Sequence, residues 1–257
     1  MIKKWNITIP ELTGWRKRRA YVYIPDYWEE NPDQRYPVLY MFDGHNVFFD
    51  EDATYGKSWG MLEFLENSQI PLIVAAVECN HSPKNGRLSE YSPYTFDDQR
   101  FGHVRGRGRT TMEWMVNRFK PLIDRQYPTL PDREHTFIAG SSMGGLMTLY
   151  AVTQYNHIFG RAAALSPSLW VAPGKLDRLF REAAIDPNTV VYMDYGSDEL
   201  DNHGHMASLF GQASARLMER QVKVNCRIVP GGNHSEASWE RQIPIFMETL
   251  FYGLDEE

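Results

Sequence analysis

The chain has 257 residues, of which 42% are hydrophobic and 23% charged, an ordinary composition for a globular protein. Its formal net charge of −6 argues against a nucleic-acid-binding protein, since such proteins are usually basic. No stretch approaches the roughly 18 apolar residues of a membrane span, and residues 1–6 are not followed by the apolar run of a secretory signal. We therefore expect a single cytoplasmic domain over residues 1–257, with no nucleic-acid or membrane partner.

The first third of the chain is predicted to contain two edge strands, two buried strands and one helix. Two strand-like segments come first with no helix between them, so we expect an antiparallel edge. The later apolar runs are typical of strands covered on both faces, and Ser58 is a candidate cap for the helix between them. The predicted strands are residues 2–10, 18–24, 37–42 and 71–77, and the predicted helix is 58–67.

The segment 78–109 is long, polar and rich in Gly, Pro and Arg, and a loop of this length in a compact domain is usually functional. Its arginines could hold a carboxylate or phosphate, and its aromatic rings could stack on a sugar or phenolic ring. Alternatively, the arginines pair with acidic neighbours in a solvated loop. We predict Arg87 and Tyr91 as candidate substrate-binding residues.

From residue 110 onward, helices and strands alternate, which implies a mostly parallel sheet with helices on both faces. Pro121 is expected to kink or divide the first of these helices. The predicted helices are 110–127, 143–155, 175–184, 206–221 and 236–251, and the predicted strands are 135–139, 161–165, 189–195 and 222–229.

The segment 140–145 reads Gly-Ser-Ser-Met-Gly-Gly and fits Gly-x-Ser-x-Gly with Ser142 at its centre. A predicted strand enters the motif and a predicted helix leaves it, which is the context that gives it meaning. Gly140 and Gly144 lack β-carbons, so strand and helix can approach closely around a sharp turn that projects the Ser142 hydroxyl. We predict Ser142 as nucleophile and the N–H of Met143 as one oxyanion donor. The other interpretation is a turn that only connects strand and helix.

A serine hydroxyl needs an adjacent base, and in this type of fold the chain order is Ser, acid, His. His234 lies between the last predicted strand and the last predicted helix, at the carboxyl edge of the sheet, where ligands bind in open α/β folds. His157 follows the nucleophile too closely to reach it. We therefore predict His234 as the base.

The acid should follow the predicted strand 189–195, where a carboxylate could hold the imidazole in the right tautomer. Composition and spacing do not separate the two acidic residues of the turn, Asp198 and Glu199. His203 and His205 could suggest a metal pair, but no further His or Cys is spaced to complete a zinc site, so we expect neither a metal nor a cofactor. We expect the two cysteines to be buried free thiols. The four candidate acids are Asp194, Asp198, Glu199 and Asp201.

Several motifs together resemble the putative-esterase family of α/β-hydrolases, which includes esterase D, enterochelin esterases and bacterial feruloyl esterases. They follow the family's order over roughly the whole chain, which makes them more specific than the serine motif alone. The matching segments are 36–44, 119–124, 140–146, 159–160, 165–170 and 232–234, with Trp239 behind the last.

The resemblance implies the α/β-hydrolase fold and a catalytic Ser142 and His234. It favours Glu199 as the acid, because the family's acid often closes a Gly-x-x-Asp/Glu turn at this place. It places the second oxyanion donor just after the first core strand, at Gly44 or His45. From the matching segment 165–170, we add one residue to the candidate substrate-binding residues, namely Trp170.

The sequence thus predicts a serine carboxylic-ester hydrolase that works through an acyl-enzyme. The expected partner is a small-molecule or saccharide ester, such as a carbohydrate-linked acetyl or feruloyl ester. Three alternatives stay open: an acyltransferase of the same fold, a siderophore-lactone esterase, and a binding module without catalytic activity.

Overall fold

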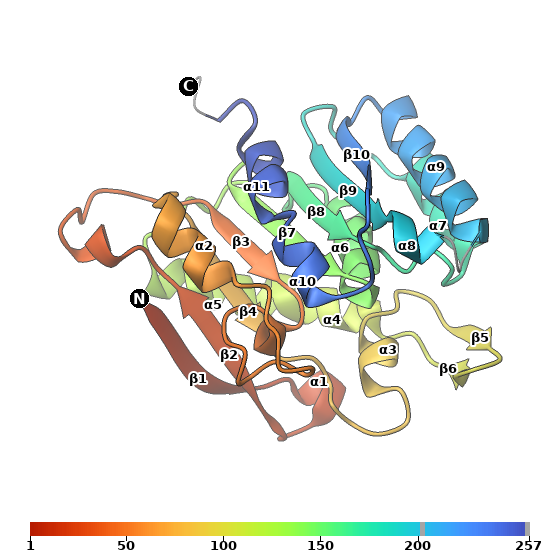
Figure 1. The fold of residues 1–257 in the computed structure, drawn as a ribbon. Coiled ribbons are helices and arrows are strands. Elements are labelled where there is room, and N and C mark those ends of the chain that lie inside the picture. Colours follow the sequence, from red (N-terminus) through yellow and green to blue (C-terminus); the bar gives the residue numbers. More distant parts are fainter. Residues whose placement is uncertain (201–203, 255–257) are drawn as a thin grey trace.

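The structure is a computed structural model that describes residues 1–200 and 204–254. Its centre is an eight-stranded sheet in the order β1-β2-β4-β3-β7-β8-β9-β10 (Figure 1). The strands from β4 to β10 in this order are parallel, whereas β2 is antiparallel to both of its neighbours. This confirms the predicted mostly parallel sheet with an antiparallel N-terminal edge. The strands are β1 (Ile2–Thr8), β2 (Lys17–Tyr23), β3 (Val38–Met41), β4 (Ile73–Val77), β7 (Thr136–Ser141), β8 (Arg161–Leu165), β9 (Val190–Gly196) and β10 (Lys223–Val229).

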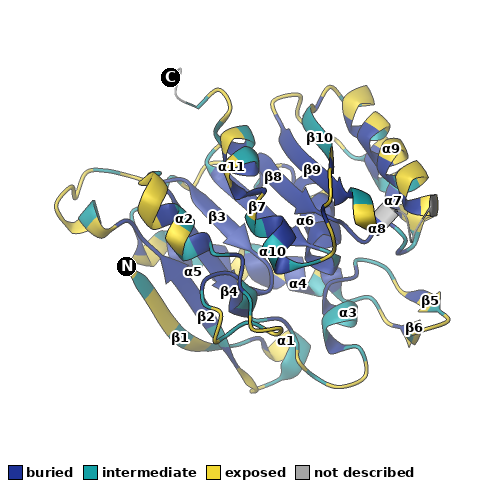
Figure 2. Cartoon of the chain, in the orientation of Figure 1, coloured by how far each residue is buried: buried dark blue, intermediate teal, exposed yellow. Residues whose placement is uncertain are grey.

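Helices cover both faces of the sheet, and each face has its own apolar core (Figures 1 and 2). On one face the core is completed by α4 (Gly108–Trp114), α5 (Lys120–Gln126), α6 (Met143–Gln154), α7 (Pro173–Glu182) and α9 (Gly204–Glu219). On the other face it is completed by α2 (Met61–Ser68) and α11 (Ile243–Phe251). The remaining helical segments are α1 (Pro10–Thr13), η1 (Asp26–Glu29), η2 (Gly44–Asn46), α3 (Gly86–Glu90), η3 (Met115–Phe119), α8 (Ser197–Leu200) and α10 (Glu236–Glu240).

Two of the predicted helices are divided in the structure, and a third begins later than expected. The helix predicted around Pro121 is divided into α4, a π-helical turn at η3 and α5, and Pro121 lies in the first turn of α5, directly after the π-helical turn. The last predicted helix is divided into α10 and α11 by a turn at residues 241–242, and a proline lies in the first turn of α11. The expectation that Ser58 caps α2 is wrong: Gly60 holds that position at a φ of 66°, and the Ser58 hydroxyl donates to Asp50 instead.

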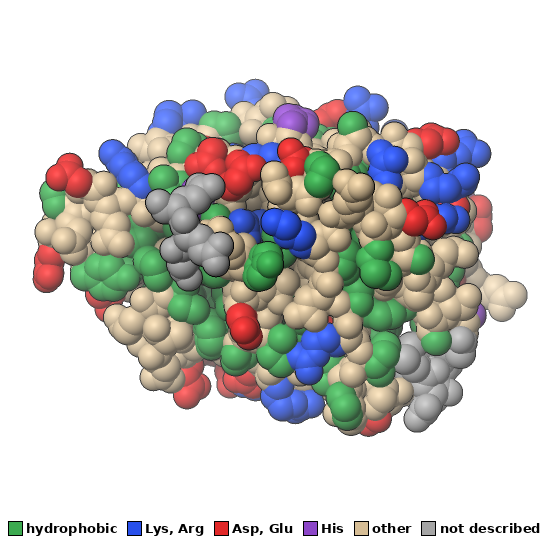
Figure 3. All heavy atoms as spheres, turned by 90° about the horizontal axis from the view of Figure 1, so that it is seen from above, with side chains coloured by type: hydrophobic (Ala, Val, Ile, Leu, Met, Phe, Trp, Pro, Cys, Tyr) green, Lys and Arg blue, Asp and Glu red, His purple; other side chains and the backbone are tan. Residues whose placement is uncertain are grey.

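The segment 78–109 is not a single loop. It contains α3 and a small antiparallel hairpin, and its last residues begin α4; the hairpin strands are β5 (Phe96–Asp98) and β6 (Gly102–Val104). Charged side chains of this segment form ion pairs: Arg100 pairs with Asp98, and Glu90 forms a buried ion pair with Arg18 of β2. Basic and acidic side chains are also interspersed over the face seen in Figure 3. None of the helices in the described residues has the length and hydropathy needed to cross a bilayer.

Candidate active site

Ser142 stands at the junction of β7 and α6 in a strained backbone conformation, with φ 59° and ψ −120°. A side chain other than glycine rarely adopts this region, and holding it there costs on the order of 1–3 kcal/mol. Backbone hydrogen bonds on both sides fix the turn: the Ser142 N–H donates to Leu165 O at 2.9 Å, and the Ser168 N–H donates to Ser142 O at 3.0 Å. The sharp strand-to-helix turn expected from the motif is therefore present, and it lies at the carboxyl edge of the sheet.

The glycines of this motif are required by close packing. A β-carbon on Gly140 would lie 2.8 Å from the carbonyl carbon of Gly144, and one on Gly145 would lie 2.9 Å from Leu165 O. A β-carbon on Gly144 would lie 3.1 Å from the Cβ of Phe42. Strand, turn and helix can therefore approach this closely only without these side chains.

Glu199 and His234 are brought together from elements far apart in the sequence. Glu199 lies on α8, directly after β9, and its Oε2 is 2.6 Å from His234 Nδ1. Its other oxygen, Oε1, accepts hydrogen bonds from the Ser166 hydroxyl at 2.6 Å and from the Gly196 N–H at 3.1 Å. Burial alone would raise the pKa of Glu199, but the hydrogen bonds from His234, Ser166 and Gly196 outweigh it and lower the pKa below its usual value. The carboxylate is therefore charged at neutral pH and can stabilise an imidazolium.

Ser166 and Trp239 hold this pair in place, a role that the sequence did not reveal. The Trp239 Nε1–H donates to the Ser166 hydroxyl at 3.1 Å, and the indole meets the His234 ring edge to face at a centroid distance of 5.1 Å. Ser166 itself has a φ of 43°, which turns its side chain under the carboxylate. Both residues lie in or beside segments that carry the family resemblance, so the sequence pointed to these positions but not to the contacts that they make.

The other candidate acids occupy different environments. Asp198 is exposed and accepts a hydrogen bond from the Ser197 hydroxyl, while Asp194 is buried and accepts from Tyr192 and from the Ser166 N–H. Burial raises the pKa of Asp194 to about 6. Asp201 and His203 lie outside the described residues, and His205 is exposed and lines the same cleft as Ser142.

Ser142 and His234 both line a cleft of about 800 Å³ over the carboxyl edge of the sheet, together with Glu199. Among the described residues, no hydrogen bond joins the Ser142 hydroxyl to the imidazole. Catalytic hydrogen bonds are often long before substrate binds and shorten in the reacting complex. The His234 side chain is 48% exposed and opens onto the same cleft as the serine.

Two groups of backbone N–H atoms are available as oxyanion donors. Met143 is the first residue of α6, and Gly44 and His45 open the turn η2 after β3. The first N–H groups of a helix have no acceptor within it, so they can donate to a ligand. A β-carbon on Gly44 would lie 2.8 Å from Val77 N, so only glycine lets η2 pack against β4 this closely. The buried His45 ring lies within hydrogen-bonding distance of Thr54, so we assign the donor role to its backbone alone.

Two of the three candidate substrate-binding residues line the cleft. Arg87 faces it from α3 while binding Asp43 through two hydrogen bonds of 2.7 and 2.6 Å. Trp170 faces it beside Phe101, with the two rings stacked at a centroid distance of 6.2 Å.

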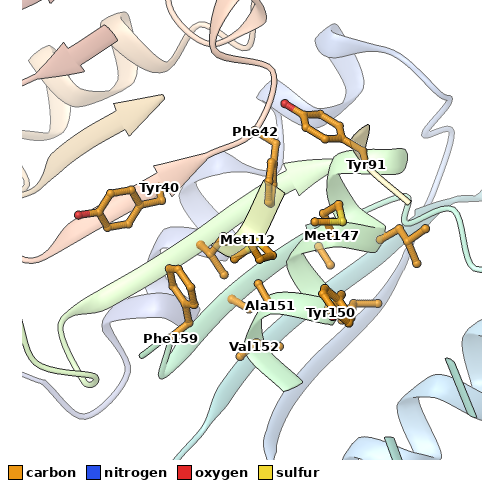
Figure 4. Packing of buried hydrophobic residues seen from close by; sticks show 14 of the residues in the cluster. Tyr40, Phe42, Tyr91, Met112, Met147, Tyr150, Ala151, Val152 and Phe159 are labelled. Carbon is orange, nitrogen blue, oxygen red and sulfur yellow. The ribbon is translucent and has the colours of Figure 1, made fainter. Parts of the chain in front are cut away.

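The prediction for Tyr91 is wrong. Tyr91 is 2% exposed and packs on Phe42 within the core, as Figure 4 shows. Its hydroxyl accepts a hydrogen bond from the Asp43 N–H and so supports the turn after β3. The polar, Arg-rich composition of its segment suggested exposure, but α3 carries this ring inward.

The comparisons with known proteins agree with this architecture. A family profile described as "Putative esterase" matches residues 13–251. The uncharacterized protein YbbA of Bacillus subtilis (strain 168) is 26% identical over 190 residues, which are 71% of this chain and 69% of that protein. An endo-1,4-beta-xylanase/feruloyl esterase of Xylanibacter ruminicola is 22% identical over 247 residues, which are 94% of this chain but 30% of that protein. Among solved structures, the enterobactin esterase FES from Shigella flexneri, in the presence of enterobactin, shares the fold with a TM-score of 0.76 and 19% identity, covering 99% of this chain and 60% of that one.

Proposed function

The chain belongs to the putative-esterase family, and on that premise we propose that it is a serine carboxylic-ester hydrolase that works through an acyl-enzyme. One observation carries the proposal: the 2.6 Å contact between Glu199 and His234, in the cleft that the strained Ser142 also lines. In the proposal, Ser142 is the nucleophile, His234 is its base and Glu199 orients the base, which is the arrangement that activates a serine hydroxyl.

In the proposed reaction, His234 takes the proton of Ser142 as the serine oxygen attacks the ester carbonyl. The N–H of Met143 and that of Gly44 or His45 bind the resulting oxyanion, and each such donor typically contributes about 3 kcal/mol of transition-state stabilisation. His234 then gives its proton to the leaving alcohol. Water, activated by the same imidazole, releases the acid and restores the serine.

Glu199 acts through His234. Its carboxylate accepts the Nδ1–H of His234, which leaves the other ring nitrogen free to take the serine proton. Because the pKa of Glu199 is lowered, the carboxylate stays ionised while the imidazole becomes charged. The buried hydrogen bond from Ser166 fixes the carboxylate, so the ring orientation does not depend on solvent.

The cleft wall supports an ester with an aromatic acyl group. Trp170 and Phe101 offer stacked rings, and the Arg100 guanidinium lies 5.2 Å from the Trp170 ring. Such a wall suits a phenolic ring that carries hydroxyl or carboxylate groups. We therefore propose a feruloyl-type ester, for instance one linked to a carbohydrate, as the first substrate to test, and a catecholate siderophore lactone as the second.

A panel of acetyl, feruloyl and siderophore-lactone esters, run on wild type and on Ser142→Ala, tests the proposal. We expect wild type to hydrolyse at least one ester with a burst of alcohol, and Ser142→Ala to lose this activity. Ser141→Ala is the matched control, because it removes the neighbouring hydroxyl and should keep activity. Equal hydrolysis by wild type and Ser142→Ala would contradict the proposal. Transfer of the acyl group to an added sugar in preference to water would assign an acyltransferase instead.

A further inference from the structure

A second group of reactive side chains lies beside the oxyanion turn. Cys79 and His81 follow β4, and His45 lies on η2, which packs against the end of that strand. One candidate ligand atom from each residue lies within 4.8 Å of the other two, and the Cys79 Sγ is 3.9 Å from the His81 Nδ1. The two imidazole rings meet edge to face with centroids 4.6 Å apart. All three side chains line a cleft of about 530 Å³ that Ser142 and His234 also line.

His45 has a ring nitrogen without a partner. The residue is 3% exposed, and its Nε2 lies 3.0 Å from the Thr54 hydroxyl. Its Nδ1 is buried and has no hydrogen-bond partner among the described residues. Leaving a buried polar atom unsatisfied costs about 1–3 kcal/mol, so such atoms in native proteins usually meet a ligand, a water molecule or an ion. The bond from Nε2 to a hydroxyl is also the kind of contact that orients a metal-binding histidine.

The charges around the cluster can accommodate a cation. Asp43 lies beside the Cys79 thiol, and its carboxylate pairs with Arg87, the only arginine among the described residues that line this cleft. A bound divalent ion would supply the charge that stabilises the thiolate.

We propose that His45, Cys79 and His81 bind a divalent cation of the zinc class. Binding forms bonds from the ion to one sulfur and two nitrogen atoms, and the proton of the Cys79 thiol leaves to solvent. In a tetrahedral zinc site, the usual bond lengths put a sulfur and a nitrogen ligand about 3.6 Å apart, close to the distance seen here. The fourth position faces the cleft and takes water. This site goes beyond the ester hydrolysis proposed above and does not depend on it.

The site was not expected from the sequence, which suggested no metal. Cys79 and His81 are only two residues apart, but their third partner lies 34 positions earlier, on the other side of a helix and a strand. Of the pair that the sequence did suggest, His203 lies outside the described residues and His205 is not part of this cluster. The positions come together because β3 and β4 are adjacent and parallel, so the segments after both strands meet at one edge of the sheet.

Titration of the reduced, untagged full-length protein with Co²⁺ tests the proposal, because a cobalt–thiolate bond gives a near-ultraviolet charge-transfer band. We expect one equivalent of Co²⁺ to bind wild type with this band, and Zn²⁺ to displace it. Cys79→Ser should lose the band, and His81→Ala, at an exposed position, should weaken binding about tenfold or more. Cys226→Ser removes the other free thiol and serves as the matched control, which should bind like wild type.

Three results would overturn the proposal: no saturable binding by wild type, an unchanged band in Cys79→Ser, or loss of the band in Cys226→Ser. Circular dichroism at the titration temperature confirms that each variant is folded. Ser142→Ala should bind Co²⁺ like wild type, so the metal site can fail or succeed independently of the esterase assignment.

Discussion

The substitution Glu199→Gln tests the orienting role of the carboxylate with almost no change in shape. The Gly196 N–H can only donate, and it faces Oε1 at 3.1 Å, so the amide oxygen of glutamine must occupy this side. The amide NH₂ then replaces Oε2 beside His234 Nδ1. A donor at that place requires an unprotonated Nδ1, so the proton moves to Nε2, which can no longer accept the proton of Ser142.

The expected loss follows from this wrong tautomer. In serine hydrolases, replacing the orienting carboxylate by its amide lowers kcat by about 10⁴, which corresponds to about 5.5 kcal/mol of transition-state stabilisation. We expect a loss of that order in kcat for a nitrophenyl ester, with KM little changed. Asp198→Asn is the matched control, since Asp198 is adjacent in the chain but exposed, and it should retain activity.

Two results would refute this reasoning. If Glu199→Gln keeps kcat within about tenfold of wild type, the tautomer does not depend on this carboxylate. If Asp198→Asn loses more activity than Glu199→Gln, the acid is Asp198. Thermal unfolding of both variants separates a loss of catalysis from a loss of folded protein.

Three further predictions concern packing, pH and specificity. Gly140→Ala should lower the free energy of unfolding by about 1–3 kcal/mol, because the new β-carbon meets Gly144. Gly174→Ala is the control, since its β-carbon meets nothing within 4 Å, and it should not lower the free energy of unfolding. Equal effects of both substitutions in urea unfolding would contradict the packing argument. Burial raises the pKa of Asp194 from 3.8 to about 6, so the stability that this group contributes is full below pH 4 and falls by about 3 kcal/mol as the pH rises past 6. The difference in unfolding free energy between wild type and Asp194→Asn should therefore shift in favour of the variant from pH 4 to 7, and a difference independent of pH would count against it. Trp170→Ala should lower kcat/KM for a feruloyl ester about tenfold more than for an acetyl ester, since one ring–ring contact contributes about 0.5–1.5 kcal/mol beyond its buried area. An equal loss for both esters would show that Trp170 does not contact the acyl group.

The sequence predicted the parts of this molecule that local pattern controls. Alternating apolar runs and helical spacing predicted the parallel sheet, and the glycines around Ser142 predicted the turn, because close packing of backbone leaves no alternative there. Because the carboxyl ends of parallel strands lie at one edge of the sheet, the sequence also predicted that His234 would meet a residue following β9. These inferences need only the spacing of apolar residues along the chain and the rules of sheet topology.

Contacts between distant side chains could not be predicted in the same way. The hydrogen bonds of Ser166 to Glu199 and to Trp239 span 33 and 73 residues, and nothing in local composition specifies them. Tyr91 was expected to contact substrate from a polar, Arg-rich segment, but at the end of α3 it lies in the core. The exposure of Asp198 and the burial of Glu199 likewise depend on how the short helix α8 meets the sheet.

Covalent labelling with a fluorophosphonate ester tests the central assignment most directly, because such reagents react with a serine only when its oxygen is activated. Peptide mass spectrometry of the labelled wild type should find the adduct on Ser142, and labelling should be slowed strongly in His234→Ala. An adduct on Ser141 or elsewhere, or labelling of Ser142 at the same rate without His234, would contradict the account.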